Sequence, residues 1–134
     1  MRPSRPQRAR RRGVLSMELV FTLPILGVLL AGLLEFSVLF FARADVVEAC
    51  RAGARKATLY GVTQIDVENE IRRVLAPRLQ RGMRVTTKLN VGSGDLVTVS
   101  VSTPMSTAAP DLLWPIGFSL QGRNLYCQTR MAKE

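Results

Sequence analysis

Two acidic residues in apolar surroundings are the best candidates for chemistry in this chain. Glu18 lies five residues beyond Gly13, between a basic N-terminal arm and an apolar run of residues 19–42, and Glu35 lies inside that run. A charged side chain at the centre of a membrane helix costs about 2.5–3.5 kcal/mol on insertion scales, so an acid in such a place usually has a function. We therefore select Glu18 and Glu35 as candidate functional residues.

The remaining residues offer little that could carry catalysis. The chain has no histidine, which is the most versatile general base and the most common metal ligand. Its acidic residues are few and scattered, and no glycine-rich segment has the spacing of a phosphate-binding loop. We therefore expect no enzymatic activity, no metal and no cofactor.

The positive charge is concentrated in the N-terminal arm. A net charge of +9 first suggests nucleic-acid binding. Six of those charges, however, come from Arg2, Arg5, Arg8, Arg10, Arg11 and Arg12. Arginines before an apolar run hold that end of a membrane protein in the cytoplasm. We therefore expect no nucleic-acid partner, and an N-terminus inside the cell.

The apolar run is long enough to cross a membrane. Its 24 residues would form a helix of about 36 Å, more than the thickness of a bilayer core. A secretory signal peptide has a shorter apolar core of roughly 7–15 residues. Residues 42–44, Ala-Arg-Ala, do have the form of a signal cleavage site, so release of a secreted domain after Ala44 is a weaker alternative. The prediction is a leader (1–13), a transmembrane helix (14–42) and an extracytoplasmic domain (43–134).

Two helices are predicted beside and beyond the membrane. Residues 43–60 combine small and charged residues with no proline, which favours continuation of the first helix as far as Gly61. Thr63 and Asp66 have the spacing of a capping box at the start of a second, amphipathic helix. Pro77 should end that helix near residue 75 or 76.

An alternating pattern then predicts a hairpin. Residues 84–91 and 96–102 alternate between apolar and polar types, with a turn at 92–95, and Pro104 closes the second strand. The valines at 97, 99 and 101 are expected to face inward.

A third strand is expected near the end of the chain. Residues 105–118 are predicted to form an apolar loop that crosses over to a last strand, which starts at Phe118 or Asn124 and runs to Met131. This loop is more simply explained as folding over its own core than as a surface for a partner. The predicted class is α+β, with a long N-terminal helix, a short second helix and a three-stranded antiparallel sheet on the long helix.

Cys50 and Cys127 both fall in the predicted extracytoplasmic domain. Disulfides form in oxidising compartments, so a bridge between these two residues is plausible. The alternative is two buried free thiols.

The first third of the chain resembles the TadE family of minor pseudopilins, which belong to tight-adherence (Flp-type) pilus systems. The resemblance covers about residues 13–57 and rests on Gly13, Glu18, Leu23-Pro24-Ile25-Leu26, Glu35-Phe36 and Ala52-Gly53-Ala54-Arg55. It implies a pilin-like fold for the external domain. It also implies a protein of the cytoplasmic membrane that takes part in pilus assembly and surface adhesion, and that can enter the pilus.

The resemblance assigns roles to particular residues. A prepilin peptidase would cut after Gly13, so that Val14 becomes the new N-terminus. Glu18 would then pair with the α-amine of a neighbouring subunit. Glu35 would act in assembly by pairing with a partner protein or with Arg43; the alternative is that it is simply exposed at the membrane interface.

The implied partners are the peptidase, other pilins or pseudopilins, the assembly machinery and the membrane. The rival interpretation is a single-pass membrane protein that carries a small external binding domain and never polymerises.

Overall fold

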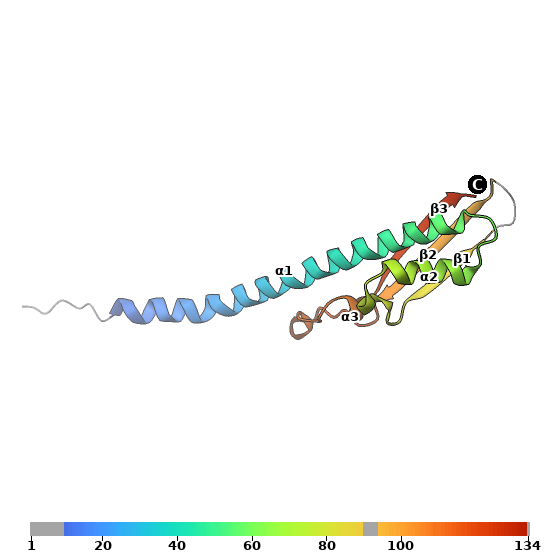
Figure 1. The fold of residues 1–134 in the computed structure, drawn as a ribbon. Helices are drawn as coiled ribbons and strands as arrows, with labels where there is room; N and C mark the ends of the chain where they lie inside the picture. Colours follow the sequence, from blue (N-terminus) through green and yellow to red (C-terminus); the bar gives the residue numbers. More distant parts are fainter. Residues whose placement is uncertain (1–9, 90–93, 134) are drawn as a thin grey trace, which may run out of the picture.

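One helix dominates the molecule. The structure, a computed structural model, describes residues 10–89 and 94–133, with side chains described from residue 16 onward. Helix α1 spans Arg10–Ala57 and continues through Pro24 (Figure 1). Of the predicted leader, residues 1–9 lie outside the described residues and 10–13 belong to α1.

Helix α1 has two halves with different surroundings. Residues 16–30 are exposed on every side. From residue 31 onward, one stripe of the helix is covered at intervals of three or four residues, which is the helical period. The buried members of this stripe are Glu35, Ala42, Val46, Ala49, Cys50, Gly53, Ala54 and Ala57. Most of them are small, so the rest of the domain packs close to the helix backbone.

The end of α1 comes slightly earlier than the sequence predicts. The helix stops at Ala57, where the buried stripe also ends, and the backbone N–H groups of Thr58 and Leu59 bond carbonyls three residues back in a tighter turn. Gly61 follows with a φ of 73°, a left-handed conformation that glycine adopts without strain.

The second helix forms as predicted. Helix α2 spans Gln64–Val74, and both halves of the capping box between Thr63 and Asp66 are present. The helix ends before Pro77, which opens the short helix η1 (Pro77–Gln80). Val67 and Ile71 are the buried residues of α2, and it packs on α1.

The sheet confirms the predicted hairpin and third strand. Strands β1 (Arg84–Lys88), β2 (Leu96–Pro104) and β3 (Asn124–Ala132) are antiparallel and lie in the order β1-β2-β3. Strand β1 ends three residues before the predicted boundary, and residues 90–93 lie outside the described part. The inward valines at 97, 99 and 101 are fully buried. One face of the sheet packs on α1 and α2, and Figure 1 shows this layered arrangement.

The connection between β2 and β3 is more structured than a plain loop. It begins with α3 (Met105–Ala108) and contains a short turn of helix, η2 (Trp114–Ile116). We call residues 109–123 the crossover loop. In Figure 1 it extends from the sheet back along α1, toward the N-terminal half of that helix. The overall α+β architecture is therefore the predicted one.

Candidate functional site

Glu35 is the acid that the fold encloses. Its side chain is fully buried, and its Oε2 atom accepts hydrogen bonds from the backbone N–H groups of Leu112 (2.8 Å) and Leu113 (3.0 Å). Its Oε1 atom is also buried and has no hydrogen-bond partner among the described residues. Hydrogen bonds to an ionised acceptor are stronger than neutral ones, so the two N–H groups offset part of the cost of burying this acid.

Apolar contacts hold the crossover loop against the same turn of α1. A Cδ1 atom of Leu113 lies 3.8 Å from the position that a Cβ would take on Gly32, so the glycine leaves room for that leucine. The rings of Phe36 and Phe118 are in tilted contact, with centroids 5.8 Å apart. The loop therefore closes over α1 between residues 32 and 36.

Within the chain, Glu35 contacts the crossover loop and not Arg43, and pairing with a partner protein stays a prediction. Arg43 is exposed, and the described residues contain no ion pair between it and Glu35. The carboxylate is bound instead by backbone groups 77 and 78 residues away in the chain. No side-chain pattern could have indicated this partner, because every non-proline residue carries the same N–H group.

Glu18 lies in the opposite environment. It is exposed, and its apolar neighbours Met17, Leu19 and Val20 each expose more than 60% of their surface. No ion pair or side-chain hydrogen bond of the Glu18 carboxylate occurs among the described residues.

The structure keeps the two acids apart. Glu18 and Glu35 are 17 positions apart on one continuous helix, which separates them by about 26 Å. Gly13 and Val14 both lie within α1, and Val14 is four positions before Glu18 and so on the same face. Gly13, Val14 and Glu18 therefore lie together in sequence near the start of α1, and Glu35 lies far from them on the same helix.

The two cysteines meet at the contact between α1 and the sheet. Both are free thiols here, and the Cys50 Sγ lies 3.4 Å from the carbonyl oxygen of Val99 and 3.6 Å from that of Cys127. Burial raises the pKa of the Cys50 thiol to about 11. The disulfide between Cys50 and Cys127 stays a prediction.

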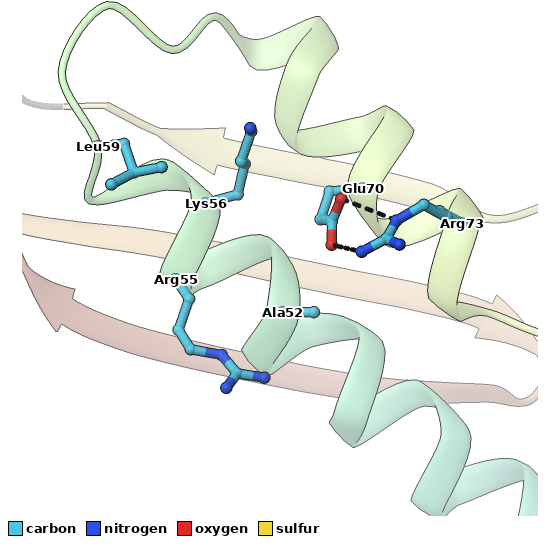
Figure 2. A pocket seen from close by; sticks show the side chains of 6 residues that line it. All are labelled: Ala52, Arg55, Lys56, Leu59, Glu70 and Arg73. Atoms are coloured by element: carbon cyan, nitrogen blue, oxygen red, sulfur yellow. Dashed lines mark hydrogen bonds and ion pairs between the residues drawn. The ribbon is translucent and has the colours of Figure 1, made fainter.

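A shallow, open pocket lies between α1 and α2 (Figure 2). It is lined by Ala52, Arg55, Lys56, Leu59, Glu70 and Arg73. The Arg73 guanidinium bonds the Glu70 carboxylate at 2.6 Å and lowers the pKa of that acid, while Arg55 points away from the pair. The described residues also contain no group of three or more metal-ligating side chains. Nothing in this pocket pairs a base with a nucleophile.

Comparison with known protein families finds a match for one region of the chain, the long helix. Residues 13–55 match the family model of TadE-like proteins. The match begins at Gly13, includes Glu18 and Glu35, and ends two residues before the end of α1, so it covers about a third of the chain. Searches among curated proteins and among solved structures found no match. The similarity thus lies in the long helix, and α2 and the sheet are outside it.

Proposed function

We propose that this chain is a minor pseudopilin of a tight-adherence pilus. In this proposal, a prepilin peptidase removes the N-terminal arm after Gly13. Helix α1 then holds the protein in the cytoplasmic membrane, with its N-terminus inside and the sheet domain outside. From there the subunit takes part in pilus assembly and surface adhesion, either in the fibre or at its base.

One observation carries the proposal: the first half of α1 is apolar and exposed all round. Residues 16–30 are all exposed, yet most of their large side chains are hydrophobic. Helix α1, described with side chains from Ser16 to Ala57, contains a stretch long and apolar enough to cross a membrane, and residues 16–30 form most of its exposed half. In water such a surface would be unfavourable, so it needs lipid or the matching helices of other subunits. The similarity of residues 13–55 to TadE-like proteins supports contact with other subunits as well as contact with lipid.

In this proposal, the α-amine that cleavage creates on Val14 pairs with the carboxylate of Glu18 in a neighbouring subunit. Cleavage after Gly13 leaves an α-amine on Val14. Glu18 is exposed among apolar side chains and needs a cation to offset the cost of its charge there. An amine from a neighbouring subunit would supply one and would set the axial position of one helix against the next.

The mature N-terminus is the first test. We expect intact mass and terminal sequencing of the protein from a producing bacterium to give a chain that starts at Val14. A start at Asp45 would instead indicate a secreted domain. Retention of Met1 would indicate a simple anchor, and either result would contradict the proposal.

Two substitutions then separate cleavage from assembly. Gly13→Leu should keep the arm attached, because a large side chain next to the cut obstructs the approach of the peptidase. Glu18→Ala should be cut normally but should fail to enter or support pili, measured on fibres sheared from cells. Leu19→Ala is the matched control, because it truncates the next residue of the helix, which is also exposed but carries no charge. This variant should assemble.

The alternative, an anchored binding module that does not polymerise, is supported by the outer face of the sheet. That face is polar and slightly hollow, and its lining residues are Thr86, Lys88, Thr98, Ser100, Tyr126, Gln128 and Arg130. Normal assembly of the Glu18→Ala variant, together with loss of function on changing this face, would favour the alternative.

A further inference from the structure

The crossover loop exposes several apolar side chains that the domain does not cover. Leu113 and Leu120 are buried and help to hold the loop in place. Leu112, Trp114 and Ile116, however, expose 41%, 68% and 60% of their surface. The loop therefore has an inner set of apolar residues that pack on the domain and an outer set that the domain leaves uncovered.

The position of the loop along α1 explains what could cover the outer set. A bilayer core is about 30 Å thick, which about 20 helical residues cross. Counted from Gly13, just after the arginines, 20 residues reach Gly32. This is the residue that Leu113 contacts, and Glu35 and Phe36 follow within one turn. If the span starts further along α1, the loop lies deeper. In the first case the loop lies beside the helix where it leaves the membrane, and in the second it lies within the outer part of the bilayer.

We infer that the crossover loop is a second membrane contact, with Trp114 and Ile116 inserted into the outer surface of the bilayer that α1 crosses. The inference rests on the membrane span in the proposed function. On α1, Phe40 and Phe41 are also exposed, within two turns of the loop contact at Phe36.

The residue types fit the boundary between headgroups and acyl chains. Tryptophan is enriched there because its ring is apolar and its indole N–H is polar. Arg123 lies over the Phe118 ring at 4.9 Å, so the loop also carries a cation that can reach lipid phosphates. We therefore expect the exposed side chains of the loop to contact lipid and not a partner protein.

Trp114 is the only tryptophan in the chain, so it reports directly on this contact. The full-length protein is reconstituted into vesicles of phosphatidylethanolamine and phosphatidylglycerol, with and without bromine on the acyl chains. We expect blue-shifted emission, loss of most of the intensity on brominated lipid, and weak quenching by acrylamide. Emission typical of water, strong quenching by acrylamide and no loss on brominated lipid would overturn the inference.

A control moves the reporter to the other end of the domain. The loop leaves and rejoins the sheet at the Pro104 and Asn124 pair, whereas Leu96 pairs with Ala132 at the opposite end and is exposed. In the double variant W114F/L96W, we expect the tryptophan to be quenched by acrylamide and unaffected by brominated lipid.

Two further readouts separate the ways in which the experiment can fail. If the protein does not float with the vesicles, the membrane span of the proposed function is wrong, and the inference falls with it. If the protein floats but Trp114 is protected from both quenchers, another copy of the chain covers the loop. That result would overturn the lipid contact and leave the proposed function standing.

Discussion

Among single residues, Glu35 has the widest structural effect, because it connects α1 to a segment 77 residues later in the chain. Its Oε2 atom satisfies two loop N–H groups that would otherwise be buried beside apolar side chains. An acid inside an apolar run thus has a structural role within its own subunit. Glu18, which resembles it in the sequence, has no such role and remains available to another subunit in the proposed function.

We predict that Glu35→Ala releases the crossover loop without unfolding the domain. Each hydrogen bond to a charged group contributes about 1.5–3 kcal/mol, so losing both should speed amide exchange at Leu112 and Leu113 by at least about a hundredfold. Hydrogen exchange resolved at these two amides measures the effect. Glu48→Ala is the control, since Glu48 is an exposed acid of the same helix with a long 3.5 Å ion pair to Arg55. Unchanged exchange in Glu35→Ala would contradict the role assigned to this acid.

At the scale of secondary-structure elements, the domain depends on how closely α2 and the sheet approach α1. A Cβ on Gly53 would lie 2.6 Å from the Cγ1 atom of Ile71, so α2 occupies the space that any side chain at this position would need. The other buried positions of α1 in this region are mainly alanines, which permit the same close approach.

Gly53→Ala is therefore predicted to destabilise the domain. Alanine favours a helix over glycine by about 0.5–1 kcal/mol, but overpacking costs about 1–3 kcal/mol, and Ile71 is fully buried with little room to move. We expect a net loss of about 1–2 kcal/mol, measured by thermal or denaturant unfolding. Gly27→Ala is the matched control, because a Cβ there meets nothing within 4 Å. Equal stability of the two variants would show that α2 can shift freely.

The start of α2 should add a dependence on pH. Hydrogen bonds from the backbone and the hydroxyl of Thr63 lower the pKa of Asp66 below its ordinary value of 3.8, and Lys56 on α1 acts in the same direction. Because the folded state favours the ionised acid, this contribution is present at pH values above 3.8 and is lost as the pH falls through the lower folded value. Asp66→Asn should therefore lose less stability on acidification than the wild type, as followed by unfolding at each pH. If the stability of the two proteins fell equally with decreasing pH, Asp66 would not be the source of this pH dependence.

The elements that the sequence predicts correctly are those with a local signal. The capping box at Thr63, the stop at Pro77 and the alternating valines of β2 depend on neighbours in the chain, and each is confirmed. The contact between Glu35 and the crossover loop depends on backbone groups far away in the sequence, so no periodicity indicates it. For the same reason the sequence predicts that residues 105–118 cover the core, but not that they reach Gly32.

For the whole molecule, the main feature is that α1 joins the exposed apolar half to the domain as one uninterrupted helix. The direction in which Glu18 points is therefore fixed relative to the sheet. Each residue of an α-helix turns the chain by about 100° and advances it by about 1.5 Å. A change in helix length between the two halves should consequently alter assembly while leaving the domain intact.

Insertion of one alanine after Leu30 tests this coupling. Residue 30 is the last of the fully exposed half, so the insertion should leave the unfolding temperature of the domain unchanged. It rotates Glu18 by about 100° relative to the sheet, and we expect loss of the protein from sheared pili. Leu30→Ala, which alters the same place without rotation, should assemble. Normal assembly of the insertion variant would mean that the two halves act independently.

The continuity of α1 also has a mechanical consequence. In the proposed function, a force that draws the apolar half out of the bilayer would pass along the helix axis directly into the domain core, because α1 is continuous between the two. The crossover loop must move with α1, because Glu35 and Phe36 hold it to that helix. Extraction of a subunit would therefore be a single all-or-none step, in which the helix and the loop lose their lipid surroundings together.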